Sequence, residues 1–243
     1  MKTEFLYQYN KKHRLPLREK LIAYLPRYAS TASSFRALMN LRDQLPGLAT
    51  LSEWMLGFSA ERTLPKWRAP YRANTTPNEG RVGEVVLLAD TFNTNFEPEN
   101  LNAARQVLEA AGYKVHHAEA SPGGRPLCCG RTFLAAGLVD EAKTEASRTL
   151  AALKPFVERG VPIVGLEPSC LLTLRDEFTV ILPSGETKDL ADNAFLFEEF
   201  LAREKEAGRL QLDLKPIAQK KALLHGHCHQ KAFAAMGAVE SVL

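Results

Sequence analysis

"VPIVGLEPSCLLTLRDEF", residues 161–178, predicts a β-strand that leads directly into an α-helix. Residues 161–167 form a short apolar run, which is typical of a strand buried on both faces of a parallel sheet. The helix is expected to begin at Pro168, because proline is tolerated in the first turn of a helix. A strand followed at once by a helix is the repeating unit of α/β proteins.

The same alternation runs through the chain from residue 84 onward. The predicted strands are "EVVLLAD" (84–90), "KVHHAEA" (114–120), residues 161–167 and "KKALLHGHC" (220–228). The predicted helices cover residues 99–113, closed by Gly112, and residues 140–160, 168–178 and 193–208. This order favours an α/β fold with a parallel sheet and helices on both faces.

Residues 1–73 differ from the rest of the chain in charge. They carry thirteen Lys or Arg against five Asp or Glu, a balance of +8, whereas the whole chain carries +3. Their apolar spacing predicts helices at 17–25, 31–45 and 51–58, with Pro26 and Pro46-Gly47 as stops, before a proline-rich extended connection at 63–80. We therefore expect a basic helical segment and the start of a linker over 1–73, followed by an α/β domain over 74–243.

The composition is typical of an intracellular globular protein. The chain has 243 residues, of which 45% are hydrophobic and 24% charged. It contains no run of eighteen apolar residues, and its first residues lack the apolar stretch of a signal peptide. We expect a cytoplasmic protein, either free or peripheral to the inner face of the membrane. In that reducing compartment the four cysteines are expected to be buried thiols or metal ligands rather than disulfides.

Each cysteine follows a predicted strand. Cys128 and Cys129, in the glycine-rich turn "GGRPLCCGRTF" (123–133), follow the second strand, Cys170 follows the third and Cys228 follows the fourth. Open α/β sheets bind ligands at the carboxyl edge of their strands, so this edge is expected to gather the thiols. Cys170 is also expected in the first turn of a helix, where the dipole and free N–H groups lower a thiol pKa. Such thiolates can hold an iron–sulfur cluster or a tetrahedral zinc ion, and the residues alone leave both open.

Structural roles compete with these functional ones. Taken alone, Cys170 is better interpreted as a buried hydrophobic side chain. The adjacent pair is harder to explain in that way, because neighbouring side chains of an extended segment point in opposite directions. In "HGHCHQK" (225–231), His227 and His229 are further candidate metal ligands beside Cys228, whereas His225 is favoured as a hydrogen-bonding residue at a strand end.

Three stretches together resemble one protein family. "LCCGRTFLAAGLVDEAK" (127–143), "GLEPSCLLTLRDEF" (165–178) and "HGHCHQKA" (225–232) are similar to the cysteine-rich CCG domain of FAD-linked oxidases of the D-lactate, D-2-hydroxyglutarate and glycolate type. More distantly they resemble the cysteine-rich subunit of heterodisulfide reductase and the iron–sulfur subunit of anaerobic glycerol-3-phosphate dehydrogenase. The resemblance covers nearly the whole chain. It implies two related α/β halves that bind an iron–sulfur cluster, of the 4Fe–4S type. The implied ligands are Cys128, Cys129, Cys170 and Cys228, with two arrangements open: Cys228 joins the other three around one centre, or it needs a second CCG turn as its partner.

The sequence departs from the family pattern in several places. "ADTFNT" (89–94) ends the first strand where other members have a cysteine, and Glu167 stands at the first position of what is elsewhere a C-x-x-C motif. Glu167 is thus a candidate ligand or neighbouring charge, with a plain surface carboxylate as an equal alternative. The chain also stops before the second CCG turn of the family and begins after its ferredoxin-like cysteines. We therefore expect a fragment of a longer polypeptide that is largely metal-free on its own.

The resemblance favours one function over two alternatives. It implies the iron–sulfur electron-transfer portion of an FAD-linked oxidoreductase that oxidises a 2-hydroxy acid, inactive as an isolated chain. The implied partners are an FAD-binding oxidase domain, a ferredoxin-like cluster domain and an electron acceptor, either a quinone or a soluble carrier. A structural zinc-binding or thiol-bearing interaction domain is the alternative, although one adjacent pair and two distant cysteines fit zinc less well. In a third hypothesis the basic residues 1–73 bind a membrane surface or nucleic acid. We expect no nucleic-acid partner, because these residues contain no recognised nucleic-acid-binding motif.

Overall fold

A computed structural model describes residues 2–73, 80–121, 123–215, 218 and 221–243. The chain forms two compact units. The first unit comprises residues 1–72, 89–101 and 119–152, and the second comprises residues 73–88, 102–118 and 153–243. No helix among the described residues has both the length and the apolar character needed to cross a bilayer.

The second unit contains a parallel four-stranded sheet with the strand order β2-β1-β3-β4. The strands are β1 (Gly83–Leu87), β2 (Tyr113–His116), β3 (Ile163–Gly165) and β4 (Ala194–Leu196). Val85 of β1 faces Val115 of β2, and Val86 faces Ile163 of β3 on the other side. Val85, Val86, Ile163 and Val164 are fully buried, as the apolar runs of their strands predict.

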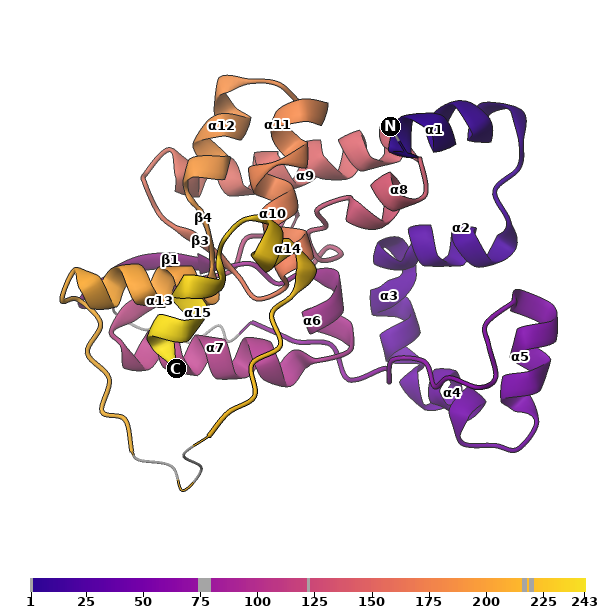
Figure 1. Cartoon of the computed structure of the whole chain (residues 1–243), viewed down its shortest axis with the longest axis horizontal. Helices are drawn as coiled ribbons and strands as arrows, with labels where there is room; N and C mark the ends of the chain where they lie inside the picture. Colours follow the sequence, from indigo (N-terminus) through magenta and orange to yellow (C-terminus); the bar gives the residue numbers. More distant parts are fainter. Residues whose placement is uncertain (1, 74–79, 122, 216–217, 219–220) are drawn as a thin grey trace. The chain divides into compact units, whose positions relative to one another are not determined.

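Helices cover both faces of this sheet, which confirms the predicted fold class. β2 lies on one side of β1, whereas β3 and β4 lie on the other. Right-handed connections therefore place helix α7 (Pro98–Ala110) on one face and α10 (Pro168–Arg175), α11 (Glu177–Ile181) and α12 (Gly185–Asp192) on the opposite face (Figure 1). The remaining helices of this unit are α13 (Phe197–Glu206), α14 (Cys228–Ala232) and α15 (Met236–Val242).

The fourth strand is not where the sequence predicts it. Residues 221–227 form no strand, and Lys220 lies outside the described residues. The sheet instead ends with β4, which occupies the beginning of the helix predicted at 193–208. The reason is burial: Ala194 and Leu196 are buried beside β3, whereas Leu223 is 99% exposed.

The first unit is helical, which confirms a helical N-terminal segment. Its helices are α1 (Lys2–Lys12), α2 (Leu17–Ala23), α3 (Leu25–Ser34), α4 (Arg36–Asn40), the 3₁₀ helix η1 (Leu41–Asp43), α5 (Leu48–Leu56), α6 (Thr91–Asn95), α8 (Arg131–Ala135) and most of α9 (Val139–Val157). Pro26 does not end a helix as predicted but lies in the first turn of α3, where its missing N–H is no loss. The helix predicted at 31–45 is divided among the end of α3, α4 and η1.

The proline-rich stretch after α5 is anchored to this helical unit. The side chain of Asn40 accepts a hydrogen bond from the backbone N–H of Trp67 at 2.9 Å and donates one to its carbonyl at 3.0 Å. The Trp67 ring is buried with Ala29 and Ala32 of α3. Of the extended connection predicted at 63–80, residues 74–79 lie outside the described part of the chain.

A buried carboxylate ties α13 to the sheet in the second unit. Glu204 accepts hydrogen bonds from the Tyr113 hydroxyl at 2.6 Å and from Arg209 Nε and Nη2 at 2.6 and 2.9 Å. The hydrogen bond from Arg209, with those from Tyr113 and Arg203, outweighs the effect of burial and lowers the pKa of Glu204 to about 2. Because the folded pKa is depressed, this contribution to stability is present above the ordinary value of 4.5 and is lost as the pH falls toward 2.

We predict that Glu204→Gln lowers the free energy of unfolding at pH 7 by about 1–3 kcal/mol, because the charged acceptor of the buried Tyr113 hydroxyl is removed. Urea titrations of the two proteins at pH 7 and at pH 3 measure this difference. The difference is expected to shrink at pH 3, because part of the stabilisation by the native carboxylate is lost between pH 4.5 and pH 2. A difference that does not change with pH would show that the ion pairs of Glu204 do not contribute.

Candidate functional site

Cys128 and Cys129 lie in the turn between β2 and α8, within the first unit. Both are buried, at 6% exposure each. The backbone N–H of Gly130 donates to Cys128 Sγ at 3.3 Å, and the hydroxyl of Thr149 on α9 donates to the Cys128 carbonyl at 2.8 Å. Gly130 has a φ of 78°, so the turn needs a residue that adopts the left-handed region.

The surroundings of Cys128 favour the protonated thiol. Its hydrogen bond with Cys129, its burial and the negative charge of Glu145 raise its pKa well above the ordinary value, against the opposing effect of the Gly130 N–H. A soft metal bound here must therefore displace a proton, which makes binding stronger at higher pH.

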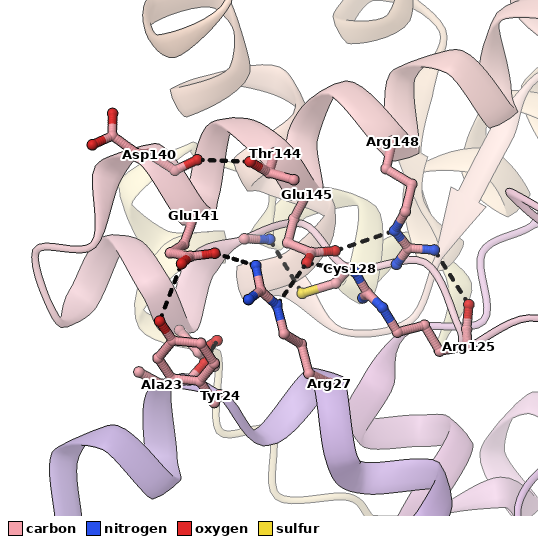
Figure 2. Close-up of polar contacts among 12 residues, drawn as sticks. Ala23, Tyr24, Arg27, Arg125, Cys128, Asp140, Glu141, Thr144, Glu145 and Arg148 are labelled. Carbon is pink, nitrogen blue, oxygen red and sulfur yellow. Dashed lines mark hydrogen bonds and ion pairs between the residues drawn. The ribbon is translucent and has the colours of Figure 1, made fainter.

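Charged side chains surround the cysteine turn in the first unit. The carboxylate of Glu145 is fully buried and accepts hydrogen bonds from Arg27, Arg125 and Arg148 (Figure 2). Burial opposes ionisation of Glu145, but the hydrogen bond and charge of Arg125, together with Arg148, outweigh it and lower the pKa. Glu145 is therefore an ionised buried group.

The sequence contains one signal for this cluster that the predictions above did not use. Ala142, Glu145, Ala146, Thr149 and Leu153 are the buried stripe of α9. A glutamate on the apolar face of a helix is costly to bury unless it is paired, so its presence indicates partners elsewhere in the chain.

Cys170 lies in the first turn of α10, as predicted, and is 4% exposed. Glu167 is the N-cap of this helix: its Oε1 accepts hydrogen bonds from the Ser169 N–H at 3.2 Å and the Ser169 hydroxyl at 2.6 Å. Glu167 thus has a local structural role that the sequence interpretation did not include. A carboxylate before Pro-Ser at the start of an apolar run is the pattern that could have indicated it.

Cys228 is exposed and is the first residue of α14, and residues 221–227 before it do not form the predicted strand. His227 Nδ1 accepts a hydrogen bond from the His229 N–H at 3.2 Å, and the two rings stack with centroids 5.2 Å apart. Gln230 completes the cap by accepting from the His227 N–H at 3.1 Å. The imidazole of His227 is therefore used to begin the helix.

The thiols are thus divided between the units. Cys128 and Cys129 belong to the first unit, and Cys170 and Cys228 belong to the second, where their helices α10 and α14 contact each other. Across the described ranges, no three His, Cys, Asp or Glu side chains are grouped as metal ligands. Convergence of all four thiols at one sheet edge remains a prediction.

Each unit offers two thiols, which are the type of ligand that iron–sulfur clusters use. The first unit offers two adjacent sulfurs, one of which already accepts a backbone N–H in the way that cluster ligands and sulfides do. The second unit offers two thiols in the first turns of helices. In the stretch 89–94, where the resemblance predicts a cysteine, Asp90 caps α6 by accepting hydrogen bonds from the N–H groups of Phe92 and Asn93 at 2.8 and 3.0 Å.

The chain is similar to several known dehydrogenase proteins. It is 25% identical over 221 residues to a subunit of the anaerobic glycerol-3-phosphate dehydrogenase of Escherichia coli (strain K12), a match that covers 88% of this chain and 54% of the relative. It is 28% identical over 193 residues to a D-2-hydroxyglutarate dehydrogenase of Pseudomonas putida, covering 73% of this chain and 18% of the relative. The D-2-hydroxyglutarate dehydrogenase of E. coli (strain K12) is 24% identical over 243 residues, with 93% of this chain and 22% of the relative covered.

The chain therefore spans about half the length of the first of these relatives and about a fifth of the other two. No protein-family model matches the sequence. No solved structure gives a significant match. These relatives support a role connected with an oxidoreductase.

Gly130 provides a test of how tightly the cysteine turn packs. A Cβ at Gly130 would meet the Ala142 carbonyl oxygen at 3.0 Å and its Cα at 3.2 Å, whereas at Gly160, which also has a positive φ, it would meet no atom within 4 Å. We predict that Gly160→Ala lowers the free energy of unfolding by about 1–2 kcal/mol, and Gly130→Ala by about 1–3 kcal/mol more. Equal losses in urea titrations would show that the turn is loosely packed.

The burial of the thiols predicts their reactivity. In the native metal-free chain, Cys228 is expected to react first with a thiol reagent such as DTNB, because it is the exposed cysteine, and Cys128, Cys129 and Cys170 are expected to react slowly. Cys228→Ser should remove the fast phase and leave the slow phases unchanged. Several fast thiols in the native chain would contradict the burial described here.

Proposed function

We propose that this chain is the iron–sulfur electron-transfer portion of an FAD-linked oxidoreductase. The observation that carries the proposal is the buried Cys128–Cys129 pair, whose turn directs the Gly130 N–H at a cysteine sulfur. Two further thiols, Cys170 and Cys228, lie in the first turns of helices in the second unit. The similarity to proteins named as dehydrogenases and as a dehydrogenase subunit supports the same assignment.

The proposed cluster ligands are Cys128, Cys129, Cys170 and Cys228. A bound cluster supplies one-electron transfer between a flavin and an acceptor. The protein's part is to hold the thiols, to donate the Gly130 N–H to Cys128 Sγ and to bury the pair from water. In this proposal Glu167 and His227 act as helix caps that orient the residues beside Cys170 and Cys228.

The complete reaction belongs to a larger assembly in this proposal. A 2-hydroxy acid would be oxidised at FAD in a separate domain or subunit, and the chain would pass its electrons to a quinone or a soluble carrier. The name of one relative as a subunit supports a multi-subunit setting. The 2-hydroxy acid class is supported by the relatives named as D-2-hydroxyglutarate dehydrogenases. We place this assembly in the cytoplasm.

Anaerobic reconstitution of the chain with iron and sulfide tests the proposal. The isolated chain is expected to be largely metal-free before this treatment. After it, we expect bound iron and sulfide, broad visible absorbance that bleaches on reduction, and a paramagnetic signal in the reduced state. Cys128→Ser, Cys129→Ser and Cys170→Ser should each remove most of the iron, because each removes a thiolate ligand. His225→Ala, which changes an exposed residue with no proposed role, is the control and should keep its iron.

Two outcomes would contradict the proposal. Stoichiometric zinc, bound without iron and lost in the same cysteine variants, would favour the alternative of a structural zinc site. Iron that is retained in all three serine variants would show that these thiols are not the ligands.

A further inference from the structure

Glu145 accepts hydrogen bonds from three arginines in the first unit. Its side chain is fully buried on α9, and its Oε1 accepts a hydrogen bond from Arg125 Nη2 at 2.6 Å and from Arg27 Nε at 3.3 Å. Its Oε2 accepts a hydrogen bond from Arg148 Nε at 3.2 Å. Each arginine comes from a different part of the unit: α3, the cysteine turn and α9 itself.

The arginines around Glu145 connect it to the cysteine turn (Figure 2). Arg125 belongs to the cysteine turn and precedes Cys128 in it. Arg148 donates from Nη2 to the Pro126 carbonyl at 2.6 Å and from Nη1 to the Arg125 carbonyl at 3.3 Å. Glu145 thus orients the guanidinium group that holds the backbone immediately before Cys128.

Thr149, one turn after Glu145 on the same helix, holds the next part of the turn. Its hydroxyl donates to the Cys128 carbonyl at 2.8 Å. The carbonyls of residues 125, 126 and 128 are therefore all bound by side chains of α9. The turn has little regular structure of its own, so these contacts decide where its two sulfurs lie.

We propose that Glu145 is a positioning residue for the thiol pair: through Arg125 and Arg148, and with Thr149 beside it, it holds the Cys128–Cys129 turn in a fixed geometry on α9 before any ligand binds. Preorganised ligands lose less entropy on binding, so such a turn is a better site for a soft metal or cluster. The part concerning a cluster rests on the proposed function. Arg27 extends the same network to the basic N-terminal segment.

Glu141 offers a matched control on the same helix. It also pairs with Arg27 and accepts a hydrogen bond from the Tyr24 hydroxyl at 3.1 Å. These contacts are with α3 and the residue before it, whereas Glu145 contacts the cysteine turn as well. Glu141→Gln therefore weakens the attachment of α3 while leaving the Glu145–Arg125 and Glu145–Arg148 pairs in place.

The test measures alkylation of each cysteine by N-ethylmaleimide in the 243-residue chain, with peptide mass spectrometry to separate the sites. Cys170, buried in the second unit, is the internal reference for general unfolding. We expect Glu145→Gln to raise the rates at Cys128 and Cys129 about ten- to a hundredfold relative to Cys170, since hydrogen bonds to a charged group are lost. Glu141→Gln should leave this ratio within about twofold of the unchanged chain.

Variants of Thr149 test the proposal even if the Glu145→Gln chain does not fold. Thr149→Val preserves the shape of the side chain but removes the hydroxyl, and should raise the rate ratio about two- to tenfold. Thr149→Ser restores the donor and should return the ratio to that of the unchanged chain. A Thr149→Val chain with an unchanged ratio, or equal effects of Glu141→Gln and Glu145→Gln, would overturn the proposal.

The outcome is independent of the iron measurement. If the unchanged chain binds no iron after reconstitution but the alkylation ratios change as expected, the proposed function fails and the positioning role of Glu145 stands. If iron binds and the ratios do not change, the positioning role fails and the proposed function stands.

Discussion

A buried carboxylate needs partners, and in the first unit this requirement organises the structure around Glu145. An ionised carboxyl group without compensation costs several kcal/mol in the interior, so α9 can keep Glu145 only if cations reach it. Arg27, Arg125 and Arg148 do so from three directions. Because Arg125 belongs to the cysteine turn and Arg148 donates to the backbone of that turn, neutralising this charge also positions the two sulfurs. The excess positive charge of the first 73 residues is therefore used partly inside the unit, through Arg27, and is not only a solvated surface.

In the second unit Glu204 is a buried carboxylate that also needs partners, and its partners attach a helix to the sheet. Tyr113 on the edge strand β2 and Arg209 beyond α13 both donate to this carboxylate, so the helix that follows the last strand is secured across the sheet to the opposite edge. Helix starts supply the remaining polar contacts: Glu167 caps the helix of Cys170, and His227 caps the helix of Cys228. Candidate ligands of the sequence analysis thus serve as caps, because the first N–H groups of a helix need acceptors.

The chemistry of the thiols and the comparisons with known proteins support the proposed function independently. The adjacent cysteines are buried in a turn with an N–H donated to sulfur, an arrangement suited to a soft ligand, and the protonated state of Cys128 couples metal binding to proton release. The relatives are dehydrogenases and a dehydrogenase subunit, of which this chain matches about half or less. The proposed function, an electron-carrying module, accounts for both observations.

The sequence by itself determined the elements whose signals are local. The apolar runs of β1 and β3, the amphipathic pattern of α7 and α9, the glycine after α7 and the proline that begins α10 were sufficient for an α/β fold with a parallel sheet and for a helix at Cys170. Only the tertiary structure decided the rest. β4 forms at residues 194–196 rather than near Cys228, because a three-residue strand is stabilised by pairing with β3 and not by its own pattern. Likewise, Glu145 has partners about twenty residues before it and more than a hundred residues before it, and such pairing exists only once the chain has folded.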